Sequence, residues 1–300
     1  MPSQRLVDWT KRALPYRVTV DSLGYRGTEF PRDKPRGAVR LLVTGDSFTF
    51  GDFVDDSQTL PAQLEGQLRS RCARVEVINA GLSGATITDE AMMIERALPL
   101  HPDLVVLVFS ENDVTDLAGT QLWQQLAANR RAKSHFPLSL VYPVLRRSAL
   151  WNLALMVGAR FRASRASRAA SDGPVAGKDV AIARLGETYR RALIGVRDEM
   201  AARGVRLVFV VFPSHYSVTA PARDSQTNWA ARVGIEAGIP TFNLLTPLRA
   251  ADLPADRLYL LPSDGHPSAR GYAIVARYLA ERLSLIHPLV PVCHRGFRSP

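Results

Sequence analysis

Cysteine is almost absent from this sequence. Only Cys72 and Cys293 occur, the first expected on a helix and the second in the C-terminal tail. Two cysteines placed in this way provide neither a disulfide framework nor the ligands of a zinc site. We therefore expect no metal and no metal chemistry.

Long apolar runs are also missing. No stretch of about 18 apolar residues occurs, and the segment from Met1 to Tyr16 lacks the apolar core of about 7–15 residues that a signal peptide needs. As written, the chain is expected to be cytoplasmic. A longer native N-terminus would change that expectation to the cell envelope.

Acidic residues are lacking between Asp116 and Asp172, although the whole chain has 28 of them against 38 lysines and arginines, a net charge of +10. This interval contains nine basic residues: Arg130, Arg131, Lys133, Arg146, Arg147, Arg160, Arg162, Arg165 and Arg168. Such an excess indicates an anionic partner or surface. A nucleic acid is not expected, because few aromatic residues and no nucleic-acid motif accompany the charge.

Within the basic interval, 130–168, the stretch from Phe136 to Ala159 combines an apolar face with Arg146 and Arg147. This pairing suits a helix lying on an anionic membrane or glycan. Two other interpretations stay open. In the first, the apolar residues pack on the domain and the arginines are solvated. In the second, the stretch forms a lid over a site.

Short apolar runs alternate with longer segments of helical spacing. The runs are Arg40–Thr44, Val75–Asn79, Leu104–Phe109, Leu207–Phe212 and Thr241–Leu244, and the expected helices span 57–71, 88–98, 179–203, 224–237 and 267–285. Ser57 and Asp224 are the expected N-caps of two of them, and Gly204 and Gly238 follow helix ends. Nearly continuous hydrophobicity is typical of parallel strands covered on both faces. The sequence predicts an α/β fold, a three-layer α/β/α sandwich around a flavodoxin-like, parallel five-stranded sheet.

The 300 residues, 46% of them apolar, are enough for one large domain with a sizeable core. We assign this domain to residues 38–285, after an N-terminal extension at 1–37 and before a C-terminal tail at 286–300. One interval, about 116–178, interrupts the alternation after the third strand and is expected to be a helical insertion.

Ligands of open α/β sheets bind beyond the carboxyl ends of the strands. The first strand ends in Gly45-Asp46-Ser47-Phe48-Thr49-Phe50-Gly51. A serine in such a turn is exposed as a nucleophile must be, although a serine after a strand is also a common helix N-cap.

The next two strands end in backbone and amide donors. The second is followed by Asn79-Ala80-Gly81-Leu82-Ser83-Gly84 and the third by Ser110-Glu111-Asn112-Asp113. Donors converging near Ser47 would form an oxyanion hole. Taken singly, the same residues also fit ordinary turns, Asx-turns or helix caps.

Two histidines are candidates for the same edge. His266 lies in Pro262-Ser263-Asp264-Gly265-His266-Pro267, where Asp264 at i−2 could orient the imidazole of a general base. The alternative makes Asp264 a helix N-cap and His266 a surface residue. His215, after the fourth strand, is a candidate wall of a substrate pocket or part of a plain surface loop.

Together these four blocks resemble the SGNH (GDSL) hydrolase superfamily, from about residue 38 to 283. Ser47 matches the nucleophile, Gly84 and Asn112 match the second- and third-block residues, and Asp264 with His266 matches the last block. Ser110 stands where the third block usually has glycine, and the last block reads Asp-x-His instead of Asp-x-x-His. Asp264 is still the expected orienter, because Ser263 at i−3 of His266 carries no negative charge. Residues 21–27, Asp-Ser-Leu-Gly-Tyr-Arg-Gly, also resemble a segment that often precedes this domain in bacterial members.

The resemblance implies acyl transfer without a cofactor. His266 would take the Ser47 proton, and the N–H groups of Ser47 and Gly84 with the Asn112 amide would bind the oxyanion. With water as acceptor, the protein would be an esterase that removes a small acyl group from a carbohydrate or another small alcohol ester. A sugar acceptor would make it an O-acyltransferase, and a rival from another class is a non-catalytic anion-binding or glycan-binding module.

Overall fold

The central sheet is parallel and five-stranded. The computed structural model describes residues 4–6, 16–72, 74–119, 175–287, 289 and 293. Its strands are β3 (Val39–Thr44), β4 (Val75–Asn79), β5 (Leu104–Ser110), β6 (Arg206–Phe212) and β7 (Thr241–Asn243), in the order β4-β3-β5-β6-β7. All neighbouring pairs are parallel, and this order is the flavodoxin-like one, so the predicted sheet is confirmed.

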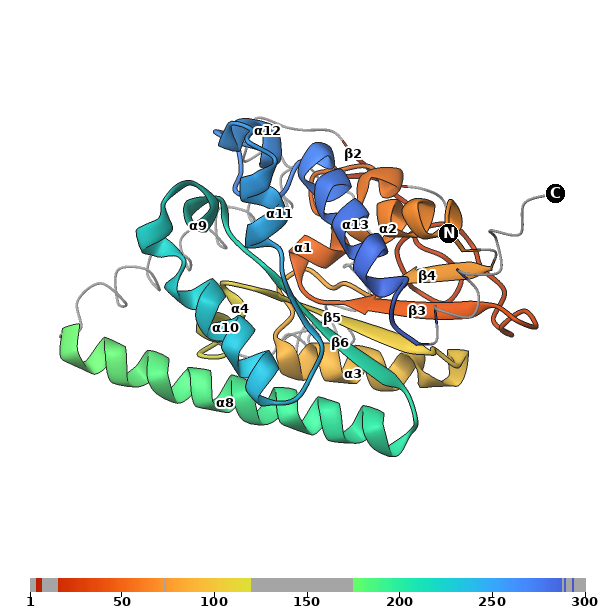
Figure 1. Ribbon diagram of the computed structural model, residues 1–300, viewed down its shortest axis with the longest axis horizontal. Coiled ribbons are helices and arrows are strands. Elements are labelled where there is room, and N and C mark those ends of the chain that lie inside the picture. The colour runs from red at the N-terminus through yellow and green to blue at the C-terminus, as the bar shows by residue number, and fades with distance from the viewer. Residues whose placement is uncertain are drawn as a thin grey trace, which may run out of the picture.

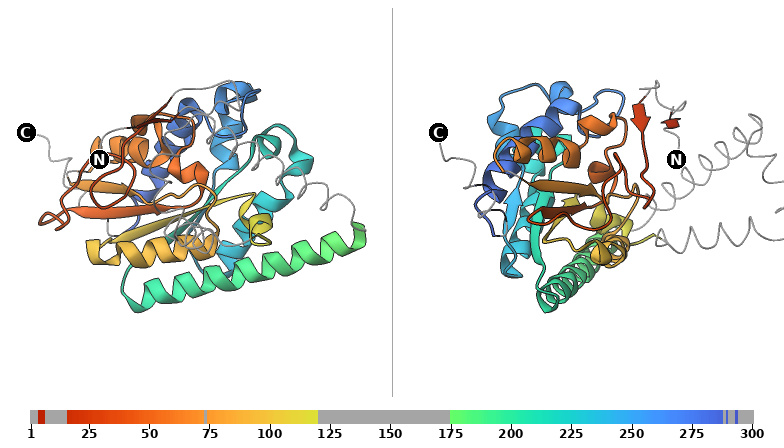
Figure 2. Two further views of the ribbon diagram at one scale, coloured as in Figure 1. Left: turned by 180° about the vertical axis from the view of Figure 1, so that it is seen from behind. Right: turned by 90° about the vertical axis from the view of Figure 1, so that its right-hand side faces the viewer.

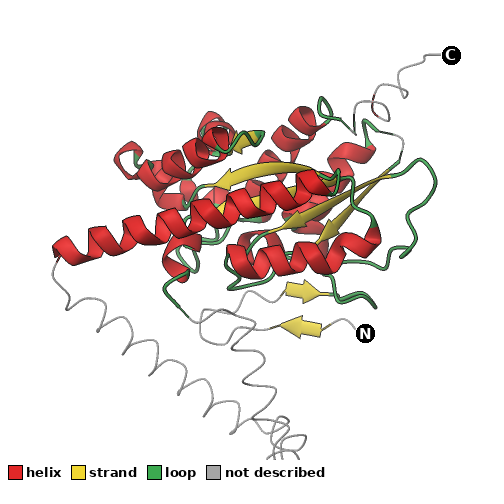
Figure 3. Cartoon of the chain, turned by 90° about the horizontal axis from the view of Figure 1, so that it is seen from below, coloured by secondary structure: helices red, strands yellow, loops and turns green. Residues whose placement is uncertain are grey.

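Helices cover both faces of the sheet (Figure 1). Leu41 and Val43 of β3 face one core and Leu42 faces the other, because successive side chains of a strand point to opposite sides. The first core is closed by α2 (Leu60–Arg69), α11 (Leu245–Ala250), α12 (Ala255–Leu258) and α13 (Ala269–Leu283). The second is closed by α3 (Ile87–Ala97), α8 (Val175–Ala202) and α10 (Ser225–Glu236). Figure 2 shows α3 and α8 on one side of the sheet, and Figure 3 shows α8 running across it.

Several short elements were not predicted. They are the helices α1 (Ser47–Phe50), α4 (Asp113–Asp116) and α9 (His215–Thr219), the 3-10 turns η1 (Asp56–Gln58), η2 (Leu98–Leu100) and η3 (Pro221–Arg223), and a separate antiparallel pair, β1 (Gln4–Leu6) with β2 (Tyr16–Val18). The helices α11 and α12 were missed as well. Elements of three to six residues are too short to show a hydrophobic period.

The predicted insertion and the basic interval fall largely on residues 120–174, which lie outside the described residues. Their helical structure and their anionic partner therefore stay predictions. Of the helices that the structure describes, none joins enough length to enough hydropathy to span a membrane.

The two cysteines form a disulfide, which the sequence analysis did not predict. The bond joins Cys72, just after α2, to Cys293 across 221 positions. With only one possible pair and no framework spacing, the sequence gives no sign that the end of α2 and the tail meet.

Residues of the predicted N-terminal extension pack closely on the domain. Arg40 at the start of β3 is fully buried and donates hydrogen bonds to the backbone carbonyls of Pro31 and Arg32. The boundary between residues 37 and 38 stays a prediction, but the segment 16–37 is not separate from the α/β body.

Candidate active site

Ser47 begins the short helix α1, directly beyond the carboxyl end of β3. Asp46 is the N-cap, and its Oδ1 accepts a hydrogen bond of 2.9 Å from the Phe48 N–H. Gly45 has a φ of +158°, and a Cβ there would lie 2.3 Å from Thr49 Oγ1 and 2.8 Å from the Val108 carbonyl oxygen. Because Asp46 is the N-cap, Ser47 is the first residue of the helix, and its backbone N–H has no acceptor within the helix.

The structure brings His266 and Asp264 to Ser47. His266 Nε2 lies 2.7 Å from Ser47 Oγ, and His266 Nδ1 is hydrogen-bonded to Asp264 Oδ1. Asp264 also accepts a 2.9 Å bond from the His266 backbone N–H, and its side chain is only 3% exposed. The N-cap of α13 is Ser268, which accepts from Gly271 N, so Asp264 does not cap that helix.

This arrangement fixes the tautomer of the imidazole. A proton on Nδ1 that is shared with the Asp264 carboxylate leaves Nε2 as the acceptor facing Ser47 Oγ. Asp46 Oδ2 is a competing acceptor, but it lies at 3.5 Å from the hydroxyl instead of 2.7 Å. The Ser47 proton is therefore directed at His266.

Buried side chains fix the two site loops. Tyr259 donates to the Pro213 carbonyl at 2.8 Å and so ties the start of the His266 loop to the end of β6. Tyr272 of α13 donates to the Phe48 carbonyl at 2.9 Å and thus anchors α1, the helix that begins at Ser47. Both tyrosines are fully buried.

The loop with Gly84 lies against the turn of residues 45–51 that carries Ser47. Leu82 N donates to the Gly45 carbonyl at 2.9 Å, and a Cβ on Gly81 would lie 2.2 Å from Phe50 N. Gly84 itself is exposed and has a φ of +77°. The structure therefore places this loop beside α1.

Asn112 reaches the same place from the end of β5. Its Nδ2 donates to Asp46 Oδ2 at 3.2 Å and to Asp116 Oδ2 at 2.8 Å. The Asp46 oxygen is the one that lies 3.5 Å from Ser47 Oγ, so the amide and the hydroxyl share one neighbour. Asn112 precedes α4, yet its side chain makes no capping bond.

Four residues that the sequence analysis did not single out also surround the site. The rings of Phe48 and Phe53 lie 5.2 and 5.3 Å from the His266 ring, and Phe53 has a φ of +66°. Asp52 accepts a 2.9 Å bond from Ser83 Oγ. Burial raises the pKa of Asp52, against the lowering effects of this hydrogen bond and of the His266 charge. In the sequence, only their closeness to Ser47 and Gly84 indicated that these four residues would lie near the site.

His215 lies beside the loop of Asp264 and His266. A Cβ on Gly265 would be 3.3 Å from His215 Nδ1, and the His215 ring lies 3.8 Å from that of Tyr216. Burial lowers the pKa of His215, opposed by the charges of Glu111 and Asp264. A neutral imidazole is thus favoured next to the loop of Asp264 and His266.

Buried carboxyl groups lie near the turn that carries Ser47. Asp113 accepts a 2.9 Å bond from Ser110 N, whereas neither side-chain oxygen of Glu90 has a hydrogen-bond partner among the described residues. Burial, with the charges of neighbouring carboxylates, raises the pKa of both groups well above their ordinary values. In the part of the chain that the structure describes, no group of three or more histidine, cysteine, aspartate or glutamate side chains is placed to hold a metal.

Comparison with known proteins gives one family. Residues 43–274 match the profile of the GDSL-like Lipase/Acylhydrolase family, a span that includes Ser47, Gly84, Asn112, Asp264 and His266. No curated protein matches the chain.

Solved structures of low identity are also similar. One is a lipolytic protein of the G-D-S-L family from Desulfitobacterium hafniense DCB-2, with 15% identity over 81% of this chain and 98% of that chain and a TM-score of 0.49. Another is Axe2, an acetylxylan esterase from Geobacillus stearothermophilus, with 16% identity over 86% and 98% of the two chains and a TM-score of 0.49. A third is LAE5, an alpha/beta hydrolase from the metagenome of Lake Arreo, Spain, with 18% identity over 81% and 95% and a TM-score of 0.49.

Proposed function

Because the chain belongs to the GDSL-like lipase/acylhydrolase family, we propose that it cleaves ester bonds through a covalent acyl-enzyme on Ser47. The observation that carries this proposal is the 2.7 Å contact between Ser47 Oγ and His266 Nε2, with Nδ1 of the same ring on Asp264. A nucleophile, a base and a group that orients the base are the parts that serine hydrolysis requires.

The reaction has two halves. His266 takes the Ser47 proton as Oγ attacks the ester carbonyl, and then gives that proton to the departing alcohol oxygen. A water molecule next attacks the acyl-enzyme and gives a proton to His266, and His266 returns that proton to Ser47 Oγ as the carboxylic acid leaves. Asp264 keeps the imidazole in the required tautomer and stabilises its charged form during both halves.

The tetrahedral oxyanion is proposed to bind the N–H groups of Ser47 and Gly84 and the amide of Asn112. In the resting site, that amide donates to Asp46 at 3.2 Å, which is the longer of its two bonds. An oxyanion forming at Ser47 offers a full negative charge to the same N–H, so the amide can turn from Asp46 to the intermediate.

We propose a small acyl group, such as acetate, carried by a carbohydrate or another small alcohol. The aromatic rings of Phe48 and Phe53 occupy space beside the imidazole, which favours a short acyl chain. Transfer of the acyl group to a sugar hydroxyl is the second candidate, because any hydroxyl that reaches the acyl-enzyme can replace water. The rival from another class, a non-catalytic anion-binding or glycan-binding module, would have no turnover.

Hydrolysis of p-nitrophenyl acetate, butyrate and octanoate tests the proposal. We expect the acetate ester to have the highest kcat/KM, and Ser47→Ala to lower kcat by about 10⁴-fold or more, as loss of a serine nucleophile does. Ser70→Ala, the same change at an exposed serine that ends α2, is the control and should leave kcat unchanged. A folded Ser47→Ala protein that keeps most of its turnover would eliminate the mechanism. Adding a sugar alcohol to the assay and detecting its ester would identify a transferase.

His215 is proposed as a wall of the ester pocket, because it lies against the Asp264–His266 loop. In the same series of esters, His215→Ala should change KM more than kcat. Unchanged KM and kcat for every ester would remove His215 from the pocket.

A further inference from the structure

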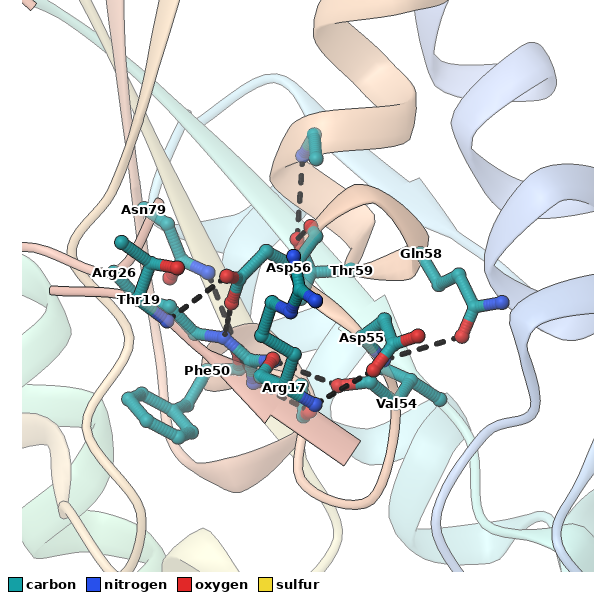
Figure 4. Close-up of polar contacts among 12 residues, drawn as sticks. Arg17, Thr19, Arg26, Phe50, Val54, Asp55, Asp56, Gln58, Thr59 and Asn79 are labelled. Atoms are coloured by element: carbon teal, nitrogen blue, oxygen red, sulfur yellow. Dashed lines mark hydrogen bonds and ion pairs between the residues drawn. The ribbon is translucent and has the colours of Figure 1, made fainter. Parts of the chain in front are cut away.

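Arg26 belongs to the N-terminal segment that resembles a companion of the family domain. Its side chain reaches residues 47–54, which begin with Ser47 and are called the nucleophile turn below (Figure 4). The side chain is 1% exposed. We propose that Arg26 is a positioning residue for the Ser47 reaction, which makes the N-terminal segment part of the catalytic unit. The inference rests on the proposed function.

Both terminal nitrogens of the guanidinium donate to backbone carbonyls of the nucleophile turn. Nη1 donates to the carbonyl oxygens of Phe50 at 2.9 Å and Gly51 at 2.6 Å, and Nη2 donates to that of Val54 at 2.7 Å. The last carbonyls of a helix have no donor within it, and they form the negative end of its dipole. A buried cation at the end of α1 therefore supplies donors to these carbonyls, although the Phe50 carbonyl also accepts from Asn79 Nδ2 and the Gly51 carbonyl from Val54 N at 3.4 Å.

The other contacts hold the guanidinium itself in place. Nε donates to Asp56 Oδ1 at 2.9 Å, and the guanidinium carbon lies 4.8 Å from the centre of the Phe50 ring. The other carboxylate oxygen of Asp56 accepts from Thr19 N at 2.8 Å, as Figure 4 shows. An acid pair and a stacked ring leave a planar, forked side chain little freedom.

The backbone of Arg26 joins a second part of the site. It forms an antiparallel bridge with Asn79, the last residue of β4. The Asn79 side chain donates to the Phe50 carbonyl at 3.2 Å and accepts from Gly81 N at 3.0 Å. Arg26 thus connects the turn after Ser47 with the loop that contains Gly84.

The turn that Arg26 holds at Gly51 and Val54 includes two residues of the site. Asp52 accepts a hydrogen bond from Ser83, the neighbour of Gly84, and the Phe53 ring packs on His266. Phe53 has a φ of +66°, a conformation that is unfavourable for a bulky side chain unless its surroundings impose it. Without the clamp, this turn is expected to relax and the imidazole to lose one of its packing partners.

The test measures kcat, KM and unfolding midpoints for Arg26→Ala and Arg40→Ala. Arg40 is the matched control, because it is also fully buried and holds the N-terminal segment, but its side chain bonds to Pro31, Arg32, Glu76 and Leu100 and not to the nucleophile turn.

We expect Arg26→Ala to lower kcat by about ten- to a hundred-fold with little change in KM, as small misalignments of reacting groups do. Millimolar guanidinium, far below its denaturing range, should restore part of that kcat. Arg40→Ala should lower the midpoint and leave kcat unchanged.

Equal effects of the two substitutions on kcat, or no rescue by guanidinium, would overturn the proposal. If Arg26→Ala does not fold, Arg26→Lys decides, because lysine keeps the charge but loses the planar fork. A wild-type kcat in Arg26→Lys would then contradict the positioning role. Absence of turnover in the wild type would instead overturn the proposed function, so the two failures are distinguishable.

Discussion

The hydroxyl of Ser110 lies among three acceptors beneath the site: Asp46 Oδ2 at 2.7 Å, Asn112 Oδ1 at 2.7 Å and Asp113 Oδ1 at 3.1 Å. A hydroxyl has a single proton to donate and cannot satisfy all of them. Burial, then the charges of Glu90 and Asp46, raises the pKa of Asp113 well above its usual range, so the protonated form is favoured and can donate to Ser110. Where the family has glycine, this chain therefore gains a hydrogen-bonded link between Asp113 and the nucleophile turn.

The prediction at the scale of a single residue concerns Asn112. Asn112→Ala should lower kcat by about 10²–10³-fold, because one oxyanion donor is lost. Steady-state kinetics on p-nitrophenyl acetate measure the effect, and a thermal melt reports stability. A variant with the kcat of the wild type but a lower melting temperature would show that Asn112 is only a turn residue.

Ser47 could be predicted because a strand end followed by polar residues shows where side chains emerge. Asp264 and His266 could be predicted because an aspartate two residues before a histidine can orient its imidazole. The same reasoning did not reveal Asp52 or Phe53. Their positions depend on a left-handed residue in an irregular turn and on contacts with Arg26 and Ser83, which no local pattern in the sequence shows.

At the scale of elements, the buried strands were the most predictable part. Each predicted run lies within about one residue of the observed strand. The signal is clearest for β3 and β5, which are buried along their whole length, whereas β4 and β7 include half-buried positions. Helix starts were less certain. Asp224 occupies the N-cap position of α10 as predicted, although its side chain makes no capping bond there. The N-cap of α2 is Thr59 and not Ser57, because Ser57 lies within the 3-10 turn η1 that precedes the helix.

The contact between α1 and the loop after β4 provides a test at this scale. Gly81→Ala should lower the free energy of unfolding by about 1–3 kcal/mol or more, because its Cβ would meet the backbone of Thr49 and Phe50. Activity should fall with it, since the two site loops are forced apart. Gly66→Ala is the control: this exposed position within α2 has open space around it, and alanine should stabilise the helix by about 0.5–1 kcal/mol. Urea unfolding of both variants measures the difference, and equal stabilities would contradict the close packing at Gly81.

The whole molecule assembles its site from distant parts of the sequence. The order of the parallel sheet brings the ends of β3, β4 and β5 to one edge, and this was predictable from alternating strands and helices. The packing of residues 16–37 on the domain and the bond between Cys72 and Cys293 were not, because each joins segments without a shared periodic pattern.

We expect the buried acid Glu90 to make the stability of the whole fold depend on pH. Burial, then the charges of Asp46 and Asp89, raises its pKa well above the ordinary value. The folded state therefore keeps a proton that the unfolded chain loses near pH 4.5, and the free energy of unfolding should fall as pH rises from there through the folded pKa. Glu90→Gln, which stays neutral, should flatten this decline.

Urea unfolding at pH 5 and pH 8 compares the wild type with Glu90→Gln and with Glu95→Gln, an exposed control on the same helix. The Glu95 variant should follow the wild type. An unchanged decline in the Glu90 variant would show that Glu90 does not hold the proton.

Covalent labelling tests the central claim, that His266 activates Ser47 as a nucleophile. A fluorophosphonate reacts with an activated serine, and mass spectrometry of the intact protein and of its peptides counts and locates the adduct. We expect one adduct, on Ser47, formed quickly by the wild type, slowly by His266→Ala and not at all by Ser47→Ala. An unlabelled folded wild type, or an adduct on another residue, would contradict it.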